Sequence, residues 1–189
     1  CDVTQESQVK DLVSSCIETF GRLDIAINNA GIATPMKPLI ETEEADMDIN
    51  FSVNTKGVFF GMKHQIPEML KTGGGSILNV ASMAGIGGAP QLSAYSAAKH
   101  AVIGLTKTAA VEYANKNIRV NAACPFFSPT PILTASDIDQ KIEMLSQVNP
   151  MKRLGTPEEM VDAMLGICSP ANSYMNGQAI AIDGGFSAM

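Results

Sequence analysis

The chain has 189 residues, of which 46% are hydrophobic and 17% charged, and its formal net charge is −6. This composition is typical of a folded globular protein rather than a disordered one. The acidic balance, without a run of lysine or arginine, argues against nucleic acid and anionic membranes as partners. The four cysteines form neither a CxxC pair nor a metal-binding spacing with histidine. We therefore expect no metal site and a reducing, cytoplasmic location.

The first part of the chain alternates between helical and strand patterns. Apolar residues recur at helical spacing after Thr4, which we expect to cap the helix, and Gly21 is expected to end it. A short strand at residues 23–27 leads into the turn sequence NNAG. A helical region over residues 42–71 follows, with an interruption expected at Pro67 or before it.

The second part continues the alternation. A strand is expected at residues 76–82, a helix from about residue 93 to residue 115, and a third strand at residues 117–124. A proline-rich stretch, PFFSPTPIL, precedes a short polar helix, and TPEEMVDAMLGICS indicates a further helix with Pro157 in its first turn. A last strand is expected in QAIAIDGG.

Strands that alternate with helices predict an α/β fold with a doubly wound, mostly parallel, Rossmann-like sheet. In such sheets ligands bind at the carboxyl ends of the strands. NNAG, Ser82 and PFFSPT each follow a predicted strand. They are therefore expected to open onto one crevice.

Tyr95 and Lys99 lie four residues apart in SAYSAAKHAVIGL and share one face of a predicted helix. Small residues between them leave room for a ligand to approach. A nearby ammonium stabilises a phenolate, so Lys99 is expected to lower the pKa of Tyr95 from about 10 and make it a usable acid/base. Taken alone, YxxxK is more often a surface tyrosine beside an unrelated lysine.

Several further stretches decide between these interpretations, because together they resemble the short-chain dehydrogenase/reductase family in its common single-domain form. Each stretch is weak alone, but their order and spacing cover essentially the whole chain. They are DV at 2–3, NNAG at 28–31, VNTKG at 53–57, NVAS at 79–82, YSAAK at 95–99, IRVNAACP at 118–125, RLGTPEE at 153–159 and IDGGF at 182–186.

This resemblance implies an NAD- or NADP-dependent oxidoreductase that interconverts a secondary alcohol and a ketone by hydride transfer. It implies that Tyr95 is the acid/base, Ser82 binds the substrate oxygen, and Lys99 tunes Tyr95 and holds the nicotinamide ribose. Asn54 would hold a water in a proton relay. The implied cofactor-binding residues are Asp2, Val3, Asn29, Ala30, Gly31, Tyr95, Lys99, Pro125, Ser128 and Thr130.

Some of these residues also admit structural roles. Asn54 could serve only a helix kink, and Asp2 could serve only the start of the first helix. Met151, Met160 and Met164 are expected in the substrate pocket from their family position. The resemblance further implies a small-molecule substrate and a homo-tetramer or dimer of the full-length protein, associating through the helices at about residues 43–71 and 93–115.

Two departures from the family pattern affect these expectations. Phe126 stands where the family has glycine, so we expect either a rearranged loop or a side chain that shapes the pocket beside the nicotinamide. The family's glycine-rich phosphate turn, TGxxxGxG, is absent. We therefore expect a single domain that lacks its first βαβα portion and is N-terminally truncated. The strand LDIAI would then have a bare apolar edge, and dinucleotide binding would be poor.

Two alternatives remain open. The chain could be a 3-oxoacyl (acyl-carrier or keto-ester) reductase on the same scaffold. That alternative predicts a basic patch near the pocket, for which Lys152 and Arg153 are the only candidates. It could also be a catalytically silent fragment that acts through oligomer contacts.

Overall fold

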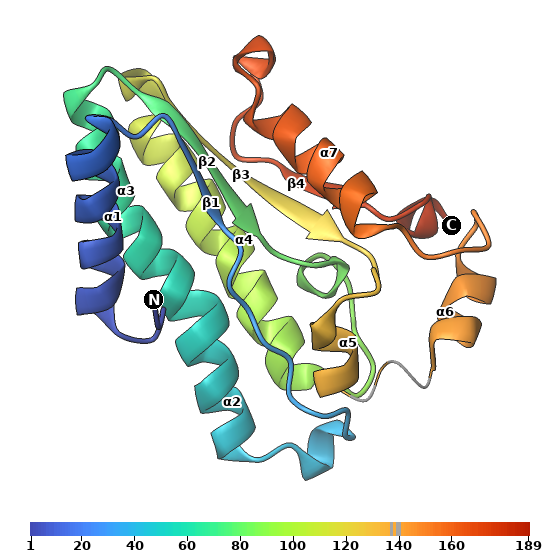
Figure 1. Cartoon of the computed structure of the whole chain (residues 1–189). Coiled ribbons are helices and arrows are strands. Elements are labelled where there is room, and N and C mark those ends of the chain that lie inside the picture. The colour runs from blue at the N-terminus through green and yellow to red at the C-terminus, as the bar shows by residue number, and fades with distance from the viewer. Residues whose placement is uncertain (137, 139–140) are drawn as a thin grey trace.

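The structure is a computed structural model that describes residues 1–136, 138 and 141–189. Its four strands form one parallel sheet in the order β1-β2-β3-β4, with helices on both faces (Figure 1). The strands are β1 (Ile25–Asn28), β2 (Gly75–Val80), β3 (Ile118–Pro125) and β4 (Ala179–Ile182). The predicted α/β, doubly wound, Rossmann-like fold is thus confirmed.

One face of the sheet is covered by α3 (Gly57–Lys71) and α4 (Ser93–Tyr113). Ile77 and Val120 of the central strands have no exposed surface and meet Val102 of α4 in this core. Helix α1 (Glu6–Phe20) packs against α3. Central strands buried on both faces explain the nearly continuous apolar runs of β2 and β3.

The opposite face is covered by α7 (Pro157–Cys168), which meets Leu78 and Ala123 in a second core. Thr156 and Glu159 form a reciprocal capping box at its start. At its end, the Arg119 guanidinium donates to the carbonyls of Cys168 and Ser169 at 3.3 and 3.2 Å. These bonds satisfy carbonyls that a helix end leaves unpaired, so α7 is fixed at both ends.

The region over residues 44–71 is helical throughout. Helix α2 (Glu44–Asn50) continues into a π-helical segment, Phe51–Lys56, and then into α3. The interruption expected at or before Pro67 is this wider segment, whereas Pro67 itself lies inside α3. Such π segments often occur at functional sites. At Gly57 the backbone allows a close approach, since a Cβ there would lie 2.9 Å from Val3 Cγ2.

Some local expectations need correction. Thr4 does not cap α1, which begins after Gln5 without a side-chain cap. Thr4 donates instead to the Asp2 carboxylate, from its hydroxyl at 2.8 Å and its backbone at 2.9 Å. Gly21 ends α1 in the left-handed conformation (φ +77°), as expected. The short polar helix after the proline-rich stretch is two helices, α5 (Pro131–Ala135) and α6 (Ile142–Val148).

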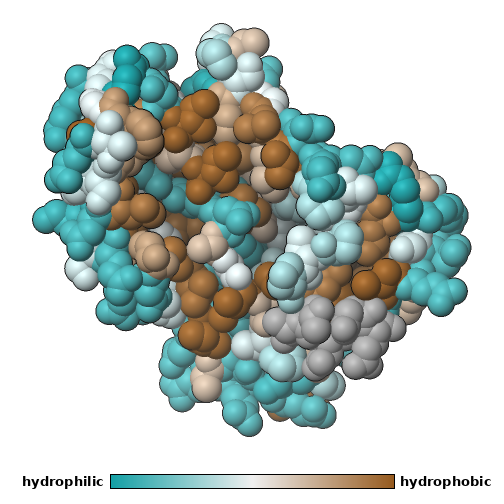
Figure 2. All heavy atoms as spheres, viewed as in Figure 1, coloured by the Kyte–Doolittle hydropathy of each residue, from teal (hydrophilic) through white to brown (hydrophobic). Residues whose placement is uncertain are grey.

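Strand β1 lies at an edge of the sheet, paired with β2 alone among the described strands. Ile25 and Ile27 remain 48% and 43% exposed. Figure 2 shows apolar side chains gathered on the side of the molecule where β1 faces the viewer. The expected bare apolar edge is therefore present. Within the described part of the chain, no helix combines the length and apolarity needed to cross a membrane.

Candidate active site

The carboxyl ends of the strands gather the segments that the sequence singled out. The strand arrowheads in Figure 1 point toward α5 and the first turns of α4. NNAG follows β1, Ser82 lies just after β2, and the PFFSPT stretch follows Cys124 of β3. The three segments thus lie at the carboxyl ends of neighbouring parallel strands, which is where ligands bind in such sheets.

Ser82, Tyr95 and Lys99 come together at this edge. Ser82 caps a 3₁₀ turn, accepting from Ala84 N at 3.1 Å, and its hydroxyl is hydrogen-bonded to Tyr95. The Lys99 ammonium lies 5.6 Å from the centre of the Tyr95 ring. It donates to the carbonyl of Val80, the last residue of β2, at 2.8 Å. The interpretation of Tyr95 as a surface residue beside an unrelated lysine is therefore wrong.

The pKa of Tyr95 departs from the sequence expectation. Burial raises this pKa above its ordinary value, and the hydrogen bond from Ser82 only partly opposes the rise. Tyr95 is therefore a protonated phenol at neutral pH.

Lys99 is buried, with 3% of its surface exposed. Removal from water disfavours the ammonium and lowers the pKa of Lys99 to about 8. Its ammonium form still predominates at pH 7. The neighbouring Cys124 thiol is also buried, and its pKa rises to about 11, so it stays protonated.

Asn54 lies in the π-helical segment and is fully buried. Its Oδ1 accepts from Ile32 N at 2.9 Å, and its Nδ2 donates to Ile32 O at 2.9 Å and to Asn50 Oδ1 at 3.1 Å. A Cβ on Gly31 would lie 2.9 Å from Asn54 Oδ1 and 3.4 Å from Lys99 Nζ. Asn54 thus connects the π segment to the loop after β1, and Gly31 of this loop lies close to the Lys99 ammonium.

Sequence reasoning missed Asn50 as part of this arrangement. Asn50 also donates to Thr34 Oγ1 at 3.2 Å, so it ties the same loop to the helix. The signal was present in the sequence, because asparagines four residues apart share a helix face.

The other residues implied for the cofactor are less closely gathered. Asn29 and Ala30 are exposed after β1. The Asp2 carboxylate binds Thr4 just before α1, and these hydrogen bonds lower its pKa. This contact supports the helix-start role of Asp2. Val3 touches Gly57, next to the π segment.

The stretch after β3 holds Pro125, Ser128 and Thr130. Thr130 Oγ1 donates to Ser128 O at 3.3 Å. The Ser128 hydroxyl is buried and, among the described residues, lacks a hydrogen-bond partner. A buried polar atom of this kind usually has a partner, so this hydroxyl indicates where a ligand could bind.

Phe126 replaces a family glycine without adopting a left-handed backbone. Its ring stacks on Phe186 at 4.7 Å and meets Phe127 edge-on at 4.8 Å. The aromatic side chain is accommodated by packing, with 8% of its surface exposed.

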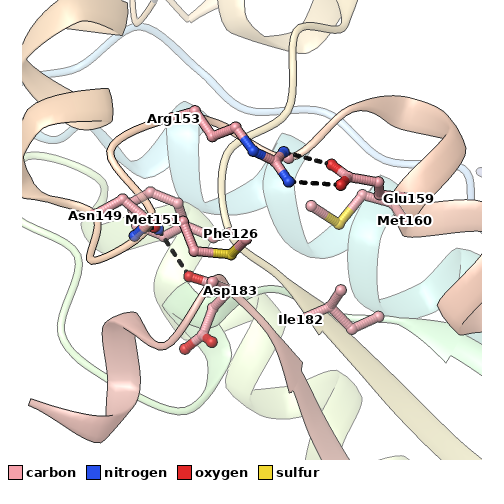
Figure 3. A pocket seen from close by; sticks show the side chains of 10 residues that line it. Phe126, Asn149, Met151, Arg153, Glu159, Met160, Ile182 and Asp183 are labelled. Carbon is pink, nitrogen blue, oxygen red and sulfur yellow. Dashed lines mark hydrogen bonds and ion pairs between the residues drawn. The ribbon is translucent and has the colours of Figure 1, made fainter.

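Phe126 also lines a cavity of about 170 Å³ between the start of α7 and the end of β4 (Figure 3). Met151, Met160 and Ile182 line it as well, and the Arg153–Glu159 ion pair lies at its side. Ser82, Tyr95 and Lys99 are not among its lining residues, and Met164 packs elsewhere, in the α7 core. The expectation that these methionines line one pocket with the catalytic residues is therefore unsupported. No group of three or more histidine, cysteine, aspartate or glutamate side chains in the described ranges could hold a metal ion.

Comparisons with known proteins agree with this geometry. Residues 1–187 match the family model described as enoyl-(acyl carrier protein) reductase. The chain is 42% identical over 184 residues to 3-oxoacyl-[acyl-carrier-protein] reductase FabG of Thermotoga maritima, covering 97% of this chain and 74% of that protein. It is 42% identical over 192 residues to 2,5-dichloro-2,5-cyclohexadiene-1,4-diol dehydrogenase of Sphingobium indicum, covering 100% and 77%.

Solved structures are similar over the whole chain. The crystal structure of levodione reductase matches with a TM-score of 0.94 and 38% identity, covering all of this chain and 76% of that one. The structure of ElxO with NADP bound matches with a TM-score of 0.93 and 35% identity, covering 100% and 77%. The geometry and the comparisons together show that this chain belongs to the short-chain dehydrogenase/reductase family, as an NAD(P)-dependent oxidoreductase that acts on CH–OH groups.

Proposed function

We propose that the chain interconverts a ketone and a secondary alcohol, with Tyr95 as the acid/base. The observation that carries this proposal is the grouping of Ser82, Tyr95 and Lys99, in which Tyr95 is protonated and hydrogen-bonded to Ser82. A phenol in this state donates a proton to a carbonyl oxygen as hydride reaches the carbon. Ser82 donates to the same oxygen and stabilises its developing charge.

The residues present fit a dinucleotide at this edge of the sheet. The unpartnered Ser128 hydroxyl offers a polar contact after β3. Gly31 leaves space beside Asn54 Oδ1 and Lys99 Nζ that a side chain would fill. Bound NAD or NADP supplies or accepts the hydride. Asn29, Ala30, Gly31, Pro125, Ser128 and Thr130 are proposed to hold it, with Asp2 and Val3 farther along the chain.

Lys99 and Asn54 are proposed to handle the proton after transfer. Once Tyr95 has given up its proton, the Lys99 ammonium stabilises the phenolate. Both amide hydrogens of Asn54 are used by Ile32 O and Asn50 Oδ1. A relay water beside Asn54 would therefore have to donate to a remaining oxygen lone pair rather than accept from the amide.

A small-molecule substrate is favoured over an acyl-carrier substrate. Carrier binding calls for free basic groups, and the two candidates are occupied. Arg153 pairs with both carboxylate oxygens of Glu159 at 2.7 Å, and Lys152 donates to Gln147 O at 2.7 Å. Association as a dimer or tetramer stays a prediction, supported by exposed Phe59 on α3 and Val111 on α4.

Tyr95→Phe tests the proposal. We expect ketone reduction to fall by a factor of about 10²–10⁴, because the variant lacks the donated proton, while NADPH affinity by calorimetry stays the same. Tyr174→Phe is the matched control, since Tyr174 is fully exposed. Turnover by Tyr95→Phe at the wild-type rate would refute the mechanism, whereas no turnover by the wild type with bound cofactor would favour the catalytically silent alternative.

A further inference from the structure

One side of Tyr95 is lined by apolar side chains from four separate segments. They come from the loop after β1, the loop before α4, the stretch after β3, and the α5–α6 region. We call this group the apolar wall; it comprises Met36, Leu92, Phe127, Ile132, Leu133 and Ile142. Tyr95 packs against it, so one side of the Tyr95 side chain faces hydrocarbon and aromatic groups.

Several hydroxyl groups near the apolar wall form hydrogen bonds within the protein. Thr42 and Ser93 bond each other at 2.8 Å. Ser96 donates to Ala84 O at 2.7 Å. Ser136 donates to Ile132 O at 2.7 Å. Among the described residues, the Ser128 hydroxyl has no partner and is proposed to hold the cofactor, which leaves the Ser82 and Tyr95 hydroxyls to meet a substrate among the hydroxyls named on this side.

The charged group at the rim is also engaged. Lys141 Nζ donates to Gln91 Oε1 at 3.2 Å and lies 3.5 Å from Met36 Sδ. Gln91 itself adopts a left-handed backbone (φ +67°), and its carbonyl accepts from Lys37 N at 3.0 Å. Lys141 therefore connects three of the four segments that carry the wall and contacts Met36 directly.

We infer that the substrate of this site carries its reacting carbonyl or alcohol as the sole polar group on an apolar body. Phe127 and Met36 are specificity-determining residues that contact this body. Additional hydroxyl groups on a substrate would lose their water against the wall without finding partners, which lowers affinity. The inference rests on the proposed function, since it takes the Tyr95 hydroxyl as the point where the substrate oxygen binds.

A pair of ketone probes tests the inference on the full chain. With NADPH or NADH present, kcat/KM for the bicyclic 2-tetralone should exceed that for dihydroxyacetone at least about 100-fold. Phe127→Ala should lower kcat/KM for 2-tetralone about 10-fold, mainly by raising KM, and leave dihydroxyacetone unchanged. Phe127→Leu should restore most of the loss.

Two further variants keep the result interpretable. Met36→Gln should act in the same direction as Phe127→Ala while preserving side-chain length. Phe20→Ala is the control, because Phe20 is 75% exposed at the end of α1, outside the wall. Binding without cofactor gives an independent measurement: saturation-transfer NMR should show 2-tetralone bound to the wild type and much less bound to Phe127→Ala.

The outcomes separate the two proposals. Equal kcat/KM for both ketones, an equal loss for both in Phe127→Ala, or unchanged 2-tetralone binding in Phe127→Ala would overturn the inference about the apolar body. If Tyr95→Phe turned over 2-tetralone at the wild-type rate, the proposed function itself would fail, whichever ketone was preferred.

Discussion

The two sides of Tyr95 are built differently. On the polar side, Lys99 and Asn54 are almost completely buried, and each is fixed by hydrogen bonds to the backbone of a strand end or the loop after it. On the other side, the apolar wall comes largely from loops and short helices, and Met36, Phe127 and Ile132 are only partly buried. The groups proposed to react are thus fixed at the carboxyl end of the sheet, while the segments proposed to select the substrate can change without disturbing it.

Lys99→Met is the largest expected disruption of the polar side. Without the ammonium, the Tyr95 phenolate loses its stabilising charge, so turnover of every substrate should fall by a factor of about 10² or more. Lys107→Met is the matched control, because Lys107 is exposed on the same helix. Steady-state kinetics with both probes check this. A loss confined to one ketone would show that Lys99 acts in selection rather than in chemistry.

Asn54→Ala should come next in size. It removes three hydrogen bonds between the π segment and its neighbours, leaving Ile32 N and O buried without this partner. The free energy of unfolding should fall by about 1–3 kcal/mol, measured by urea denaturation. Asn115→Ala, at an exposed position, should have no such effect. Unchanged stability in Asn54→Ala would mean that the loop after β1 is held from elsewhere.

Stability should also depend gradually on pH. The pKa of Lys99 is about 8 in the folded chain against an ordinary value of 10.5. Between these values the unfolded chain binds one more proton, so stability rises with pH by at most about 1.4 kcal/mol per unit. Below pH 8 both states are protonated and the contribution is flat.

The Lys99→Met variant lacks the titrating ammonium, so its free energy of unfolding should not show this increase with pH. The difference in urea-unfolding free energy between wild type and Lys99→Met should therefore grow in favour of the wild type from pH 8 to pH 10. A difference that is constant over this range would show that Lys99 is more hydrated than its burial indicates.

Much of the scaffold could be predicted from the sequence. The strand and helix periods, with NNAG, Ser82 and PFFSPT at strand ends, were sufficient to place these three segments at the same end of a parallel sheet. The spacing of Tyr95 and Lys99 correctly placed them together. These features depend on local patterns that repeat along the chain.

The parts that failed depend on tertiary surroundings. The direction of the Tyr95 pKa shift is set by burial of the side chain, which leaves no trace in the local sequence. The π segment has no periodic signature, since one extra residue in a helix resembles ordinary helical spacing. Phe126 fits because Phe186, sixty residues later, stacks on it.

The π segment also sets the rotational phase between the two halves of one long helix. Each residue of an α-helix turns the chain by about 100° and advances it about 1.5 Å. Deleting one residue from 51–56 would therefore rotate α3 by about that angle relative to α2. Gly57 at the start of α3 would then turn away from Val3, whereas α2 would keep Asn50 directed at Thr34. One additional residue lets a single continuous helix face the start of the chain and the loop after β1 at the same time.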